Sequence, residues 1–254
     1  MPQQAFLNEI RSGNWEAQLQ ATRFPGATPE LIELVRTSDP DTRLLALACL
    51  NAIGGLDVTH TALSLLEDPD PQIAVDALQV LYKHPPHDDP DCLLATYSAV
   101  ENGYLKAHLA RIAGVLEPTP DPAPWKALWK GDPGEPAASG LMTAIAKMGD
   151  FEARAQFALE MNNAIGSEFE PFFEAARYIA DTWTIPLLDN LLERTDPVLT
   201  LQVLGQPKSL RVCDLAVELL VELTEPDLSF TVDLISQYTP EQIIELRAKI
   251  ADDS

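Results

Sequence analysis

The sequence predicts an all-α protein built as an α-solenoid, in which short helical hairpins stack and a capping helix covers each end. Three observations predict this class: prolines that follow helix-capping residues, apolar residues spaced three and four apart, and an internal repeat. We expect residues 1–254 to form a single domain of this kind, with a proline-rich irregular insertion at about 116–136.

Many of the 21 prolines stand where they would begin a helix rather than break one. An Asp or Thr before the proline supplies an N-cap oxygen, and proline lacks only an N–H that the first helical position does not use. These pairs predict short helices with frequent turns and leave little room for a sheet. They are Thr28-Pro29, Asp39-Pro40, Asp70-Pro71, Asp89-Pro90, Asp196-Pro197 and Thr239-Pro240.

Polar amphipathic helices are expected at both ends of the chain. Residues 3–22 predict one such helix, and Thr239 with Gln242 forms a capping box that starts the last one. Apolar residues occupy one side of that last, otherwise charged segment, at Ile243, Ile244, Leu246 and Ile250. Terminal elements with a polar outer face are what a stacked array needs at its ends.

A repeat appears when Asp39-Pro40 is laid on Asp70-Pro71, because the apolar positions that follow then coincide. Equivalent apolar residues recur after one more, slightly longer interval along the chain, and again in a distant copy of the repeat. Each copy is one helical hairpin whose apolar face is left exposed unless neighbours stack on it. The aligned positions are Ala46, Leu50, Ala77, Leu81, Leu105, Leu109 and Ala113, with Val212, Ala216 and Leu220 as the distant copy.

The pattern resembles the HEAT-repeat family, whose second helix typically begins with Asp-Pro and continues with an aliphatic residue, Arg and Ala before Leu-Gly. Asp39-Pro40, Arg43, Ala46, Leu50 and Gly54 fit this pattern. The match is clear over residues 28–115 and weaker from about 137 to 226. In the insertion between them, Trp125 and Trp129 are expected to pack onto the array, since tryptophan prefers burial.

Charge narrows the range of partners. With 39 acidic and 17 basic residues the formal net charge is −22, which repels phosphate backbones and anionic membranes. We therefore expect no nucleic-acid and no membrane partner, and a basic protein is the partner that this charge would attract. The alternative is that the charge only keeps the protein dispersed.

The cysteines and the N-terminus predict a cytoplasmic protein. Cys49, Cys92 and Cys213 lie far apart, which argues against a disulfide framework. No basic segment leads into an apolar run at the N-terminus, and no apolar run has the length of a membrane span.

No catalytic centre is predicted, and the chain is not expected to be an enzyme. It contains no glycine-rich phosphate loop, nucleophile elbow or HExxH pair. His84, His87 and Cys92 could supply loop ligands to a metal, but a closed zinc site needs four ligands and no second Cys/His pair is near. The sequence thus predicts no metal and no cofactor.

An acidic stripe is the most informative local feature. Asp214, Glu218 and Glu222 are four residues apart and so share one face of a predicted helix, opposite a set of apolar residues. The stripe is either an ordinary solvated face or a surface that meets cations on a partner. The apolar residues opposite are Val212, Ala216, Leu219, Leu220 and Leu223.

Residues 211–224 and 239–246 also resemble the end of bacterial HEAT-like proteins encoded beside polymorphic toxins. That resemblance implies an immunity factor, which binds a cognate and here basic toxin and blocks its active site or substrate entry. Second helices usually line the concave side of hairpin solenoids, which nominates carboxylates and aromatic anchors there. The partner-binding residues predicted in this way are Asp76, Tyr82, Tyr104, Trp183, Asp214, Glu218 and Glu222.

Two other functions stay open at this stage. A general scaffold or assembly adaptor would share the same fold, which alone does not select a function. An enzyme subunit similar to the HEAT-like bilin lyases is the third hypothesis, although no nucleophile or basic group is placed for the pigment's propionates. HEAT-like DNA glycosylases need basic grooves, which this acidic chain does not predict.

Overall fold

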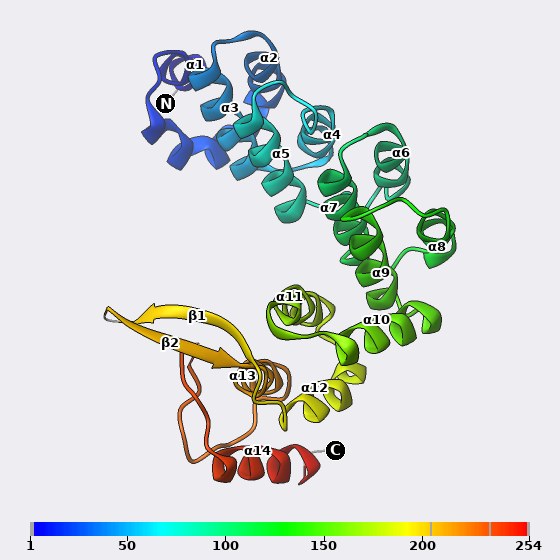
Figure 1. Ribbon diagram of the computed structural model, residues 1–254. Helices are drawn as coiled ribbons and strands as arrows, with labels where there is room; N and C mark the ends of the chain where they lie inside the picture. The colour runs from blue at the N-terminus through cyan, green and yellow to red at the C-terminus, as the bar shows by residue number, and fades with distance from the viewer. Residues whose placement is uncertain (1–2, 204, 234, 253–254) are drawn as a thin grey trace. The chain divides into compact units, whose positions relative to one another are not determined.

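The computed structural model describes residues 3–203, 205–233 and 235–252, and most of these residues are helical (Figure 1). The chain forms two compact units, Met1–Ala144 and Ile145–Ser254. A mostly helical fold was predicted and is confirmed, although the second unit contains a two-stranded sheet that was not expected. None of the helices described is long and apolar enough to cross a lipid bilayer.

Successive hairpins pack on each other in the first unit. Helix α2 contacts α3 and α4, α3 contacts α5, and α5 contacts both α4 and α7, while α6 pairs with α7. The elements are α1 (Gln3–Arg11), η1 (Trp15–Arg23), η2 (Pro25–Ala27), α2 (Thr28–Thr37), α3 (Pro40–Ile53), α4 (Leu56–Ser64), α5 (Pro71–Lys83), α6 (Asp91–Ala99), α7 (Gly103–Gly114), α8 (Pro122–Lys130) and α9 (Ala137–Lys147), within which the two units meet in sequence.

The Asp-Pro pairs begin α3 and α5 as predicted. The Asp39 side chain accepts a hydrogen bond from the Thr42 backbone N–H, and Asp70 accepts one from Gln72. The predicted starts at Thr28 and near Asp89 lie within two residues of the first residues of α2 and α6. Helix α7 begins with a cap that the proline pattern did not reveal, since Asn102 accepts from the Tyr104 and Leu105 backbone.

Most of the aligned repeat positions of the first unit lie in the core of these hairpins, whereas Leu105 is only partly buried. Ala46, Leu50, Ala77 and Leu81 are fully buried, and Leu109 and Ala113 of α7 are buried at the equivalent places. The repeat read from the sequence therefore corresponds to a physical packing unit in which the second helix of each hairpin supplies the inner residues.

The N-terminal segment differs from the single helix predicted for residues 3–22. Helix α1 ends at Arg11, Gly13 has a positive φ of 76°, and Asn14 then caps the 3-10 helix η1 through the Glu16 N–H. Glycine reaches this left-handed conformation without the steric cost of a side chain, so the helix breaks here. Phe6 of α1 stacks on Phe24 with ring centroids 4.8 Å apart.

The proline-rich insertion is not irregular throughout, which corrects the prediction for residues 116–136. It contains α8, which is capped by Asp121 through the Ala123 N–H. Trp125 on this helix is buried as expected and meets Tyr97 of α6 edge-on, with ring centroids 5.7 Å apart. Trp129 is only partly buried.

The second unit combines short helices with one β-hairpin, which Figure 1 shows as a ribbon beside α13. Strands β1 and β2 are antiparallel, with Leu199 opposite Leu210 and Thr200 opposite Ser209. The elements are α10 (Phe151–Asn163), η3 (Gly166–Glu168), α11 (Phe169–Ile179), η4 (Thr182–Thr184), α12 (Ile185–Leu191), β1 (Pro197–Val203), β2 (Gln206–Arg211), α13 (Val212–Thr224) and α14 (Pro240–Asp252).

The predicted helix start at Asp196-Pro197 is wrong, because Pro197 begins β1. Residues 197–203 alternate apolar and polar side chains and are rich in β-branched residues, a pattern that fits a paired strand. Gly205, with a φ of 78°, lies between the two strands. Pairing with residues 206–211 therefore decides the local structure, against the capping signal.

The last helix begins as predicted, and an arginine ties it to the rest of the second unit. Thr239 N–H donates to Gln242 Oε1, and Gln242 N–H donates to Thr239 Oγ1, which completes the capping box. Arg247 of α14 donates to the Asp189 side chain at 2.8 Å and to its backbone oxygen at 2.9 Å. Leu246 is fully buried.

Candidate functional site

An exposed apolar surface with a groove lies between α5 and α7 in the first unit. The groove has a volume of about 420 Å³ and is lined by residues of both helices and of the turn before α5. We call this surface the α5–α7 face and define it by five residues: Val75, Leu78 and Tyr82 on α5, and Tyr104 and Leu105 on α7. Helical spacing places the three α5 residues on one side of that helix.

Three of the predicted binding residues lie on or beside this face. Tyr104 is 70% exposed and Tyr82 is 40% exposed, and Val75, which lines the groove, is 50% exposed. Asp76 is partly exposed and accepts a hydrogen bond from the Gln72 side chain at 2.8 Å. Large apolar side chains exposed next to one another on a folded surface are a common feature of interaction sites.

A tyrosine–histidine pair fixes one end of the face. Tyr82 Oη lies 2.7 Å from His108 Nδ1, and the two rings meet edge-on. Burial raises the pKa of Tyr82, and burial together with the charge of Arg111 lowers the pKa of His108. At neutral pH a neutral tyrosine hydroxyl and a neutral imidazole therefore share one hydrogen bond, which holds the Tyr82 ring in one orientation.

Carboxylates surround the groove. Glu67 and Asp68 line it, and the exposed Glu101 precedes its lining residue Asn102. Asp68 is already paired with Arg43 of α3. The net negative charge around the groove therefore comes mainly from Glu67 and Glu101. The α5–α7 face is thus an apolar surface within a negative field.

Two of the three carboxylates of the acidic stripe predicted on α13 are buried rather than solvated. Asp214 is fully buried and accepts hydrogen bonds from the Arg211 side chain at 2.6 and 2.9 Å and from the Tyr238 N–H at 3.0 Å. The Arg211 side chain also donates to the Tyr238 backbone oxygen at 2.8 Å. Asp214 therefore joins β2, α13 and the segment before α14, and it cannot contact a partner.

Glu218 is buried as well and lines a small pocket. Only 7% of the residue is exposed, and its Oε1 has no hydrogen-bond partner among the residues described. Burial raises the pKa of its carboxyl group to about 7, against the lowering effect of Arg177, and the charges of Asp214 and Asp233 raise it further. The pocket measures about 280 Å³ and lies between α11, α13 and the β-hairpin.

The two remaining predicted residues, Glu222 and Trp183, mainly contact other residues of the second unit. Glu222 is half exposed but accepts a hydrogen bond from Arg177 Nε at 2.8 Å, which neutralises it. Trp183 is partly buried, meets Phe157 edge-on and lies 5.1 Å from the Arg154 guanidinium carbon. Neither forms an exposed anchor of the kind the sequence predicted.

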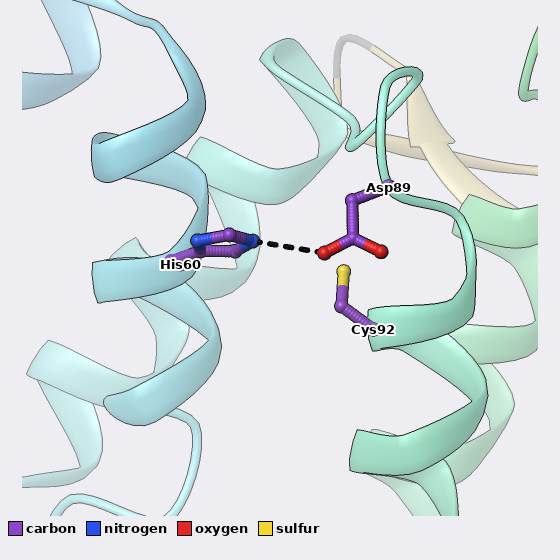
Figure 2. A group of neighbouring side chains, drawn as sticks. All are labelled: His60, Asp89 and Cys92. Carbon is purple, nitrogen blue, oxygen red and sulfur yellow. Dashed lines mark hydrogen bonds and ion pairs between the residues drawn. The ribbon is translucent and has the colours of Figure 1, made fainter.

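The loop histidines considered as metal ligands point to other partners. His84 Nε2 lies 2.7 Å from the Asn51 backbone oxygen, and His87 Nδ1 accepts from the Glu117 N–H at 3.1 Å. Cys92 instead lies beside His60 and Asp89, as Figure 2 shows. Burial, followed by the charges of Asp89 and Asp91, raises the pKa of the Cys92 thiol to about 11.

Sequence reasoning missed His60 because it lies on α4, far from Cys92 along the chain. The repeat contained a relevant signal, because it assigns α4 and α6 to successive hairpins, and an α-solenoid would place the first helices of such hairpins next to each other. No local spacing of ligand residues reveals the group of His60, Asp89 and Cys92. It could be found only by asking which residues of the following hairpin lie opposite His60.

Comparison with known proteins gives no relative: no family model, no curated protein and no solved structure matches this chain.

Proposed function

We propose that this protein is a binding module rather than an enzyme, and that its α5–α7 face binds a basic, partly apolar segment of another protein. The observation that carries this proposal is the exposure of Val75, Tyr82 and Tyr104 around an open groove. Tyrosine is enriched among residues that dominate binding energy, because it buries a large rigid surface and keeps a polar end.

The charge of the chain selects the kind of partner. A formal net charge of −22, with Glu67, Asp76 and Glu101 near the groove, attracts cationic segments and repels anionic ones. Such complementarity speeds the encounter and excludes acidic partners, while the apolar contacts supply the affinity. A segment with Lys or Arg beside one or two large apolar side chains fits both features.

The finer architecture and role are also proposals. We propose that the hairpins form a HEAT-like α-solenoid in which α3, α5 and α7 line one side, supported by the repeat and by the contacts among these helices. We further propose that the partner is a toxin and that the protein is its cytoplasmic immunity factor. The net charge, the three free cysteines and the resemblance of residues 211–224 support this role. A general scaffold is the alternative.

The proposal is tested by capturing partners with matched surface variants. The full chain, its Y104A/V75A variant and its F151A variant are used as baits in lysate of the source cells. Phe151 is 84% exposed on α10 in the second unit and so controls for loss of any exposed aromatic residue. We expect one basic protein to be retained by wild type and F151A and to bind the double variant at least about tenfold more weakly.

The same experiment separates the module from the immunity factor. If the captured protein arrests growth when expressed alone and co-expression of this chain restores growth, the toxin proposal is supported. A harmless captured protein would favour the scaffold. Equal binding by all three baits, or capture of an acidic protein, would contradict the proposed surface.

A further inference from the structure

We propose that His60, Asp89 and Cys92 form a binding site for a divalent transition-metal ion, with Zn²⁺ as the best fit. Figure 2 shows the three side chains converging from α4 and from the N-terminal end of α6. His60 Nε2 lies 3.3 Å from Asp89 Oδ2, and one ligand atom from each of the three residues lies within 4.8 Å of the others.

The distances between these side-chain atoms are close to the distances between the ligand atoms around a bound zinc ion. Zinc lies about 2.0–2.1 Å from imidazole nitrogen and about 2.3 Å from thiolate sulfur, so tetrahedral ligand atoms are about 3.5 Å apart. The His60–Asp89 separation already has this value, and Cys92 needs only a small movement toward the other two. The three groups therefore surround a point that an ion can occupy with little rearrangement.

The donor set has the chemistry of a zinc site. One imidazole, one carboxylate and one thiolate are all zinc ligands, and three protein ligands leave the fourth tetrahedral position for water or another group. Sulfur and nitrogen donors favour zinc, cobalt or copper over Mg²⁺ and Ca²⁺, which prefer oxygen. Binding replaces the proton of the Cys92 thiol by the metal, and that proton leaves to solvent.

The backbone between Asp89 and Cys92 holds these two ligands close together. The Cys92 N–H donates to the Asp89 backbone oxygen at 3.3 Å, so a turn places the residues at positions i and i+3 together. Within α6, the Thr96 hydroxyl donates to the Cys92 backbone oxygen at 2.8 Å. Exposed Asp88 and Asp91 flank Asp89 and add negative charge that attracts a cation.

An adjoining hollow gives the open coordination position room. It measures about 430 Å³ and lies between α4 and α6, with His60, Ser64, Glu67 and Thr96 among its lining residues. A water molecule or a small ligand on the metal would fit there without displacing any side chain. The ion would also link two successive hairpins, because His60 belongs to one and Cys92 to the next.

The test is a metal titration of the full chain after removal of metals with chelator. We expect wild type to bind one equivalent of Zn²⁺ with a rise in the melting temperature, since the ion binds the folded state. Co²⁺ used in place of Zn²⁺ is expected to give a thiolate-to-cobalt charge-transfer band and the intense visible absorption of a tetrahedral site.

Variants assign the ligands. H60A and C92S are each expected to weaken Zn²⁺ binding at least about tenfold. C92S is also expected to abolish the charge-transfer band, because it removes the thiolate. H87A replaces an exposed imidazole of the same segment and should bind as wild type does. His60 is exposed, so H60A decides the question even if C92S fails to fold.

Three results would overturn the proposal. These are the absence of stoichiometric binding, a cobalt spectrum without a sulfur ligand, and binding that survives H60A but is lost in H87A. The last result would place the ligands within the loop of residues 84–92 instead.

Discussion

Burial of one carboxyl group makes the second unit sensitive to pH. Glu218 of α13 has a pKa of about 7 because burial disfavours its charged form, and Arg177 of α11 offsets this only in part. Asp214 and Asp233 add to the rise. Burial raises the pKa of Tyr238, and the charge of the nearby Glu218 raises it further. The group therefore keeps its proton in the folded state at a pH where an exposed glutamate has lost it.

The sign of the pH dependence follows from the two pKa values. An unperturbed glutamate has a pKa of 4.5, so between that value and about 7 the unfolded chain releases a proton that the folded chain retains. Whatever the rest of the chain contributes, the free energy of unfolding due to Glu218 falls as pH rises through this window. Below the window, Glu218 is protonated in both states and contributes no slope.

Replacing Glu218 with its neutral isostere should remove this contribution. We expect E218Q to be more stable than wild type by about 2–3 kcal/mol at about pH 8, and similar in stability at about pH 4.5. Urea unfolding of both proteins across this range measures the difference. E225Q, at an exposed glutamate directly after α13, serves as the control and should retain the wild-type slope. An unchanged slope in E218Q would contradict the account of this residue.

At the scale of elements, the contact between α7 and α9 depends on the absence of a side chain at Gly140. A Cβ added there would lie 2.4 Å from the Ala107 Cα and 2.9 Å from the Ala107 backbone oxygen. Both are backbone atoms of α7, so the two helices would have to separate to accommodate it. Close approach of these helices is thus encoded by one glycine.

The Gly140→Ala substitution tests this contact. In an exposed helix interior alanine is more favourable than glycine by about 0.5–1 kcal/mol. The substitution would therefore stabilise the protein if Gly140 did not contact α7. We expect instead a net loss of about 1–3 kcal/mol, the range for overpacking in a close-packed core. Gly26→Ala is the control, because the nearest atom to an added Cβ there is the flexible end of Gln3, at 3.3 Å. Equal or higher stability of G140A in thermal unfolding would show that the helices adjust freely.

Considered as a whole molecule, the parts of the fold that local chemistry determines were predictable from sequence. Asp39 and Asp70 each precede a proline and cap α3 and α5, because the cap needs only residues within one turn. The repeat positions were likewise visible, since Ala46 and Ala77 occur at the same place in successive hairpins and are both buried.

The parts that tertiary contacts decide were not predictable. Asp196-Pro197 carries the same local signal as Asp70-Pro71, yet pairing with residues 206–211 makes it the start of a strand. Helical spacing correctly placed Asp214 and Glu218 on one side of α13, but it did not show that this side is also covered. Most of α13 is packed against neighbours on several sides, and the sequence of the helix alone does not reveal those neighbours.

Hydrogen exchange of the captured complex tests most directly whether a partner binds the α5–α7 face. Binding should slow amide exchange where the partner covers or rigidifies the surface. We expect protection to increase in peptides from Pro71–Lys83 and Gly103–Gly114. Peptides from the second unit, including Val212–Thr224 with its buried carboxylates, should exchange as in the free protein. Protection confined to residues 145–254, with α5 and α7 unchanged, would contradict the account.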